Sequence, residues 1–371
     1  MRNGMIIIDA DGHALDQESM YRQRLPEQFR RRRSIGGGGD GFDRRQNGRI
    51  PFPPVTVERY LQDADLQGID VMVLYPTGGL GYTRLREHDY SIAFAQTYND
   101  WIAEWCSTNP KRLKAVCITP LHTDVPAAIK ELERARQLGL VGVMVNTFMR
   151  GRNVAHRDFW PFYEACADLG IAVGFHAAGG DAMDPVCHFD TLLAMHTFSH
   201  APEQLIACTA VIYSGLLEQF PTLRVAFLEA GAGWVPFWME HMDGEWSKRK
   251  FDAPLLKMPP SEYMRSGRVF VSCEPEEKTL PYVAEWLGED NILFPSDYPH
   301  WDSTFPEAVD ELMERQDVTD QLKRKIFCDN PQRLYGFTVE PADFKAQEAS
   351  AASHSAGSTS PSGSKYNPGT P

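Results

Sequence analysis

Acidic and imidazole side chains, spaced two residues apart, follow a short apolar run near the start of the chain. The run Ile6–Ile8 is β-branched and predicts a buried strand, and Asp9, Asp11 and His13 come directly after it. Alternate residues of an extended strand point to the same side, so these side chains would project together from its C-terminal end. Carboxylates and an imidazole placed in this way can bind a divalent metal ion. The alternative is a turn at the Asp-Gly pair, and this segment alone favours neither.

Polar residues also end later apolar runs. His176, Glu229 and Asp297 each follow such a run. The simpler explanations are a hydrogen-bonded core histidine, a carboxylate that caps a helix and a turn aspartate. An aspartate buried without a partner is costly, so Asp297 should meet a cation or a hydrogen-bond donor. His300 is expected to orient Asp297 or to contact a substrate, and Glu274, which ends another run, is expected to have a structural role.

Short apolar runs alternate with amphipathic stretches along the whole chain. The predicted strands are Ile6–Asp9, Val71–Tyr75, Ala115–Thr119, Gly142–Asn146, Ile171–Phe175, Arg224–Leu228, Val269–Cys273 and Ile292–Phe294. The predicted helices are Val57–Gln67, Ser91–Ser107, Val125–Leu138, Asp158–Leu169, Pro202–Gln219, Val235–Lys248, Leu280–Leu287 and Pro306–Glu314. This alternation predicts an α/β fold, a (β/α)8 barrel, with a doubly wound sheet as the alternative. The barrel is favoured because polar residues end strands all along the chain and no glycine-rich phosphate fingerprint follows the first strand.

In such a barrel the C-terminal ends of the strands meet at one mouth, where the active site forms. We therefore expect Asp11, His13, His176 and Asp297 to hold one divalent metal ion, with Glu229 as a further ligand or an acid–base group. Nitrogen and oxygen ligands suit Zn²⁺, with Mn²⁺ or Fe²⁺ as alternatives. A bound metal lowers the pKa of its water to about 7. Asp297 would touch the metal and act as the base.

Three aromatic residues adjoin these positions in the sequence. Trp234 and Tyr298 are predicted to contact a small-molecule substrate, and Trp301 could complete an aromatic wall. The alternative for each of them is plain packing in the core.

Composition limits the class of protein. The chain has 371 residues, 43% of them hydrophobic, and a formal net charge of −13, which argues against a general nucleic-acid-binding surface. The cysteines form no Cys-x-x-Cys pair and no apolar run reaches membrane-spanning length, so we expect a cytoplasmic protein. We predict one barrel domain over residues 1–345, with loop insertions at 21–54 and 178–202. Residues 346–371, rich in Ser, Ala, Gly and Pro, are predicted to form a disordered tail.

Four sequence motifs resemble those of the amidohydrolase superfamily, and more narrowly the branch of aminocarboxymuconate-semialdehyde decarboxylase and related decarboxylases, hydratases and hydrolases. The motifs are Asp9-Ala10-Asp11-Gly12-His13, Gly174-Phe175-His176, Phe220-Pro221 leading to Glu229-Ala230-Gly231, and Ser296-Asp297-Tyr298-Pro299-His300. The resemblance implies a distorted (β/α)8 TIM barrel with one divalent metal ion, commonly zinc, and it suggests a homodimer. His13, His176 and Asp297 match the family's metal ligands.

The chain departs from this family pattern at two positions. Many members have His-x-His in the first strand, where this chain has Asp11-x-His13, and many decarboxylases have a catalytic histidine where this chain has Glu229. The first expectation is therefore metal-dependent hydrolysis of a C–N or C–C bond next to a carbonyl group in a small, carboxylated or aromatic substrate. The alternative is metal-dependent decarboxylation of an aromatic or unsaturated acid. A barrel that has lost its metal and binds a ligand without catalysis is a third interpretation.

Overall fold

Eight parallel strands form one sheet and follow one another in chain order. The computed structural model describes the chain except for residues 3, 33–55, 150, 178–188 and 345–371. The strands are β1 Ile8–Ala14, β2 Val71–Pro76, β3 Leu113–Cys117, β4 Gly142–Asn146, β5 Ala172–His176, β6 Val225–Phe227, β7 Val269–Ser272 and β8 Ile292–Leu293. Nearly all of their residues are buried, as expected for a parallel sheet covered on both faces. The predicted α/β class and strand order are confirmed.

Backbone hydrogen bonds join the segment that follows β8 to β1 and so close the sheet into a barrel. Ala10 N–H donates to the Phe294 carbonyl at 2.9 Å, and Asp297 N–H donates to the Asp11 carbonyl at 3.0 Å. The closure brings Asp11 and Asp297, which are far apart in the sequence, to the same edge of the barrel. The predicted (β/α)8 barrel is therefore confirmed.

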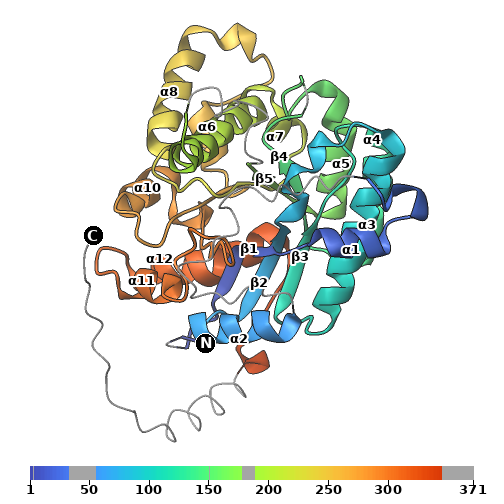
Figure 1. Cartoon of the computed structure of the whole chain (residues 1–371). Coiled ribbons are helices and arrows are strands. Elements are labelled where there is room, and N and C mark those ends of the chain that lie inside the picture. The colour runs from blue at the N-terminus through green and yellow to red at the C-terminus, as the bar shows by residue number, and fades with distance from the viewer. Residues whose placement is uncertain (3, 33–55, 150, 178–188, 345–371) are drawn as a thin grey trace, which may run out of the picture.

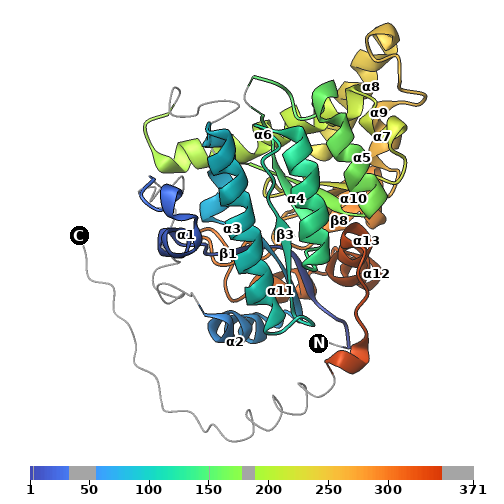
Figure 2. The ribbon, with the colours of Figure 1, turned by 90° about the vertical axis from the view of Figure 1, so that its right-hand side faces the viewer.

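Helices cover the outside of the barrel. They are α1 Glu18–Arg24, α2 Val57–Gln67, α3 His88–Ser107, α4 Val125–Gln137, α5 Trp160–Leu169, α6 Leu192–Tyr213, α7 Leu216–Gln219, α8 Val235–Lys248, α9 Pro260–Met264, α10 Leu280–Leu287, α11 Ala308–Glu314, α12 Asp320–Arg324 and α13 Asn330–Tyr335. In Figures 1 and 2, α3, α4 and α5 run along one side, and α10, α11 and α12 lie on another. None of the helices in the described part of the chain is both long and apolar enough to cross a bilayer.

β1 continues past the point where the sequence predicts its end. Its pairing with β2 shifts register between Asp9 and Gly12, and all seven residues from Ile8 to Ala14 are buried. A Cβ atom at position 12 would lie only 2.4 Å from Asp9 Oδ2, so glycine is required here by the close approach of that carboxylate. The turn at the Asp-Gly pair is therefore wrong, and the pair belongs to the strand.

The second predicted insertion is partly helical. Residues 178–188 lie outside the described residues, but α6 begins at Leu192, where the Thr191 side chain accepts a hydrogen bond from Ala194 N–H. The helix predicted over Pro202–Gln219 thus starts ten residues earlier and is divided into α6 and α7. Most of the first insertion, and the predicted disordered tail at 346–371, also lie outside the described residues.

Candidate metal centre at the barrel mouth

Two histidine side chains face each other at the ends of β1 and β5. The Nε2 atoms of His13 and His176 lie 3.2 Å apart, and both side chains are buried. His13 Nδ1 lies 3.1 Å from the Pro76 carbonyl oxygen, and His176 Nδ1 lies 2.8 Å from that of Ala177. A carbonyl oxygen only accepts, so both Nδ1 atoms carry protons and both Nε2 atoms face the mouth. Metal-binding histidines are oriented by such contacts.

Two carboxylates complete the cluster. Asp11 Oδ1 lies 3.9 Å from His13 Nε2 and 4.0 Å from His176 Nε2, and Asp297 Oδ1 lies 3.5 Å from His13 Nε2. The structure thus brings together all four predicted metal ligands, which come from β1, β5 and the segment after β8. Nitrogen and oxygen donors in this mixture suit a first-row divalent metal ion.

The surroundings of Asp11 fit such an ion. Its Oδ1 atom is buried and has no hydrogen-bond partner in the part of the chain that the structure describes. Burial raises the pKa of Asp11 well above its usual range, and the nearby carboxylates of Glu229, Asp9 and Glu274 add to this against the opposing effect of His176. Burial also lowers the pKa of His13, with help from neighbouring imidazoles, so its Nε2 lone pair is available. A divalent cation would offset the carboxylate charge and accept that lone pair.

Glu229 joins this cluster to α6. Its Oε2 atom lies 2.7 Å from His176 Nε2, and its Oε1 atom lies 3.2 Å from His200 Nε2. Burial alone would raise the pKa of Glu229, but the two imidazoles outweigh it and hold the pKa well below its usual range. Burial alone would lower the pKa of His176, but Glu229 and Asp11 outweigh it and raise that pKa to about 9. Without a metal ion, His176 is therefore protonated at neutral pH and forms an ion pair with the Glu229 carboxylate.

His196 and His200, which lie one turn apart on α6, were not among the predicted site residues. Their ring centroids are 4.5 Å apart, and His196 Nε2 lies 3.3 Å from Asp302 Oδ2. Two histidines at positions i and i+4 share one face of a helix, so the spacing itself is a signal. The signal carries no meaning while the segment is predicted as a loop.

Glu229 and Asp297 share an unusual backbone conformation. Their φ angles are 53° and 51°, and no other non-glycine residue in the described ranges has a positive φ. The left-handed region costs a residue with a side chain on the order of 1 kcal/mol. Strain of this kind concentrates at functional sites, and here it falls on two carboxylates that line the mouth.

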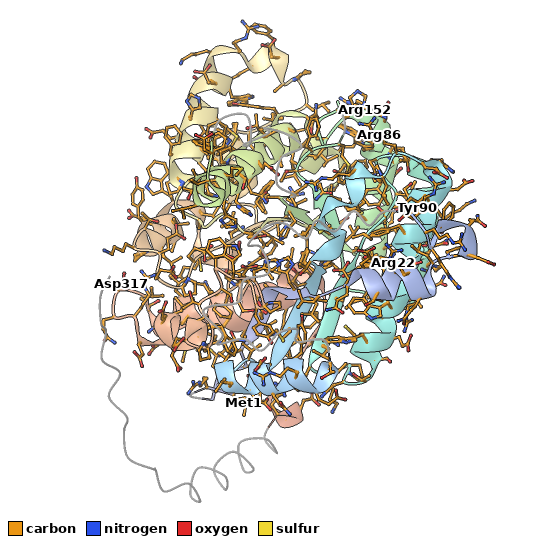
Figure 3. The ribbon with its side chains drawn as sticks, viewed as in Figure 1. Met1, Arg22, Arg86, Tyr90, Arg152 and Asp317 are labelled. Atoms are coloured by element: carbon orange, nitrogen blue, oxygen red, sulfur yellow. The ribbon has the colours of Figure 1, made fainter. Side chains whose placement is uncertain are left out.

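The mouth is rich in carboxylates. A narrow cavity and a wider one open there and share Glu229, Glu274 and Asp302. Seven acidic residues line them, and their described lining contains no Lys or Arg: Asp11, Glu229, Glu274, Glu276, Glu277, Asp297 and Asp302. Burial raises the pKa of Glu274 to about 8, and its acidic neighbours add to the shift. By contrast, Arg22, Arg86 and Arg152 lie on the side of the molecule formed by α1, α3 and α5 (Figure 3).

Tyr298 does not face the mouth, which corrects its predicted role as a substrate contact. Its hydroxyl donates to the Asp63 carboxylate on α2, and its buried ring packs edge-on against Tyr60 at 5.3 Å. Because β8 ends at Leu293 and the backbone turns at Asp297, strand alternation no longer decides where position 298 points. Tyr298 is a packing residue between the barrel and α2.

The two tryptophans lie near the cavities. Trp234 lines the wider one, and its indole N–H donates to the Gly231 carbonyl at 2.9 Å. Trp301 packs edge-on against His196 at 5.1 Å. A substrate contact by Trp234 stays a prediction.

His300 lies behind Asp297 and holds it in place. His300 Nδ1 lies 2.7 Å from Asp297 Oδ1, and His300 Nε2 lies 3.2 Å from Thr77 Oγ1. Burial lowers the pKa of His300, so the neutral ring donates through Nδ1 and accepts the Thr77 hydroxyl through Nε2. The side chain is buried and does not line either cavity, so His300 positions Asp297.

Replacing His300 with alanine is therefore expected to reduce metal affinity or turnover by about 10- to 100-fold, the usual cost of losing a partner behind a metal ligand. Metal dissociation constants and turnover of the His300→Ala variant measure this. Thr77→Val removes only the outer contact and should have a smaller effect. Unchanged metal affinity and turnover in a folded His300→Ala protein would contradict the positioning role.

The chain is similar in sequence and in fold to known proteins. The model of the amidohydrolase family matches residues 8–337. The chain is 28% identical over 245 residues to 2-amino-3-carboxymuconate-6-semialdehyde decarboxylase of Dictyostelium discoideum, a match that covers 64% of this chain and 65% of that protein. It is 24% identical over 288 residues to gamma-resorcylate decarboxylase of a Polaromonas species, covering 75% and 86%. The structure of 5-carboxyvanillate decarboxylase from Novosphingobium aromaticivorans, with bound manganese, shares the fold at a TM-score of 0.72 and 20% identity, covering 91% of this chain and 98% of that one.

Proposed function

The chain belongs to the amidohydrolase family, and from that premise we propose that it is a divalent-metal-dependent decarboxylase of an aromatic or unsaturated carboxylic acid. The observation that carries the proposal is the cluster at the barrel mouth, in which two opposed imidazoles lie beside two carboxylates. Relatives whose matches cover most of this chain are decarboxylases. These relatives support the prediction that the chain is an enzyme. They favour decarboxylation over hydrolysis, whereas the sequence alone placed hydrolysis first.

In this proposal, Asp11, His13, His176 and Asp297 hold the metal ion. When bound, the ion would supply positive charge that stabilises an anionic group of the substrate. Asp297, which lines the narrow cavity, donates its proton to the carbon that bears the carboxylate. The bond to the carboxylate carbon then breaks, its electron pair returns to the substrate ring, carbon dioxide leaves, and solvent returns a proton to Asp297. His300 keeps the Asp297 carboxyl oriented throughout.

We propose Mn²⁺ as the resident ion. The sequence alone favours Zn²⁺, but a set of two carboxylates and two imidazoles is rich in oxygen, which suits manganese. The manganese-containing structural neighbour supports this choice. Reconstitution of metal-free protein with each ion separately decides between them, and Mn²⁺ is expected to restore the higher turnover.

Hydrolysis next to a carbonyl group is the second candidate function. The acidic mouth favours it, because the described lining residues offer no Lys or Arg to attract an anionic acid. A neutral amide or ketone would enter without that repulsion.

One assay separates these functions. Protein purified without chelator is offered carboxylated phenols and unsaturated acids, together with amides and ring-cleavage products. We expect carbon dioxide release that disappears after chelation and returns with Mn²⁺. Hydrolysis without carbon dioxide release would favour the second candidate. Less than about a tenth of an equivalent of metal would contradict both, because a closed site of this kind should retain its ion.

We further propose that residues 1–345 form the single barrel domain. A homodimer, the absence of nucleic-acid and membrane partners, and a cytoplasmic location stay predictions.

A further inference from the structure

We propose that His196, His200 and Glu229 form a second divalent-cation site beside the first. These three side chains offer donor atoms that all lie within 4.8 Å of one another. Two imidazoles and one carboxylate are a donor set found in catalytic zinc sites, where a further position stays open for substrate or water. The inference does not depend on which bond the enzyme breaks.

The histidines on α6 are oriented for such a role. His200 Nδ1 lies 3.2 Å from the His196 carbonyl oxygen and 3.1 Å from Ser199 Oγ, so Nε2 is left to face Glu229 Oε1. His196 stands one turn earlier on the same face, and its Nε2 lies 3.3 Å from Asp302 Oδ2. The side chains of His196, His200 and Glu229 are 11–14% exposed, so they are accessible from the wider cavity. Metal–nitrogen and metal–oxygen bonds of about 2.0–2.2 Å would require these three side chains to rotate modestly toward a shared ion.

Glu229 connects the two sites. Its Oε2 atom faces His176, and its Oε1 atom faces His200. A carboxylate whose two oxygens face two separate sets of ligands can bridge two cations, in the manner of paired-metal sites in hydrolytic enzymes. The strained backbone at Glu229, with φ of 53°, holds the carboxylate between β6 and α6.

Charge at the mouth gives an independent reason for a second ion. Seven acidic residues line the cavities, and the described lining residues include no Lys or Arg. One divalent ion bound by Asp11 and Asp297 would offset the carboxylates that hold it. Of the other five acidic residues, the raised pKa of Glu274 keeps that group largely uncharged at neutral pH, which leaves Glu229, Glu276, Glu277 and Asp302 at the cavities. A second cation held by Glu229 next to Asp302 would offset more of this negative charge and weaken the repulsion of an anionic group.

Metal content measures the proposed site directly. The full chain is saturated with Zn²⁺ or, separately, with Mn²⁺, freed of unbound ions and analysed by mass spectrometry. We expect about two ions per chain in the wild type and about one in each of the His196→Ala and His200→Ala variants. With Mn²⁺, electron paramagnetic resonance should show two spin-coupled ions in the wild type and an isolated ion in each variant. The matched control is His241→Ala, which changes an exposed histidine on α8 and should keep two ions.

The outcomes separate this inference from the proposed function. One ion per chain in the saturated wild type would overturn the second site and leave the proposed function standing, whereas no ion would overturn both. Two ions per chain in a folded His196→Ala or His200→Ala protein would also overturn the second site. His196→Gln and His200→Gln replace any alanine variant whose circular dichroism departs from the wild type.

Discussion

A His176→Ala variant is expected to lose the metal ion at the barrel mouth and to turn over substrate more than about 100-fold more slowly, beyond the range seen when only an outer partner of a ligand is removed. His176 Nε2 lies at the centre of the cluster, 3.2 Å from His13 Nε2 and 4.0 Å from Asp11 Oδ1. Its removal takes away one imidazole donor and leaves the buried Asp11 carboxylate without its cation. Metal analysis and turnover of the purified variant measure both losses.

The same histidine predicts how metal uptake depends on pH. Glu229 and Asp11 outweigh burial and raise the pKa of His176 to about 9, so the metal-free chain carries a proton there at neutral pH. A metal ion must displace that proton, and affinity should therefore fall as the pH is lowered below about 9. Calorimetric titration at several pH values tests this in the wild type. The exposed His241→Ala variant should match the wild type, and a His176→Ala protein that keeps full metal and activity would refute the assignment.

Replacing Asp297 with asparagine is expected to lower turnover by about 10²- to 10⁴-fold, the usual contribution of a positioned acid or base, while most of the metal is retained. The amide oxygen of asparagine can still coordinate a metal ion, but the side chain cannot donate a carboxylic proton. Burial raises the pKa of Asp297 well above its usual range, and the carboxylates of Glu229, Asp302, Asp11 and Glu274 add to the shift. In the metal-free chain, these neighbours favour the protonated form of Asp297.

Turnover under saturating substrate and metal content of the same preparation test the Asp297→Asn prediction together. Asp320→Asn, which changes a fully exposed carboxylate on α12, is the control and should be unchanged in both. Full turnover in Asp297→Asn would refute Asp297 as the proton donor. Loss of the metal together with turnover would assign it to metal binding alone.

Local patterns in the sequence were sufficient to predict the barrel and the convergence of the four proposed ligands at its mouth. Apolar periodicity marks the eight strands and most of the long helices, and α2 and α8 begin and end where the pattern predicts. The short helices α1, α9, α12 and α13 were not predicted. Because parallel strands of a closed barrel all end at the same mouth, residues at their ends must converge, even with no knowledge of their partners. Asp11, His13, His176 and Asp297 were predictable for this reason, and the structure places them together.

The tertiary structure decided where side chains outside the regular strands point and which distant groups they meet. Tyr298 turns away from the mouth toward Asp63, 235 positions earlier in the chain, and no local pattern encodes that contact. His200 reaches Glu229 only because α6 begins at Leu192 and packs beside β5 and β6. Periodicity records which side of an element is buried, whereas the direction of a loop residue depends on backbone torsions and on neighbours that the closed barrel supplies. The sequence by itself therefore determined the barrel and the residues at the ends of its strands. Only the folded barrel determined that His176 pairs with Glu229, that His300 pairs with Asp297, and that His196 and His200 lie beside Glu229.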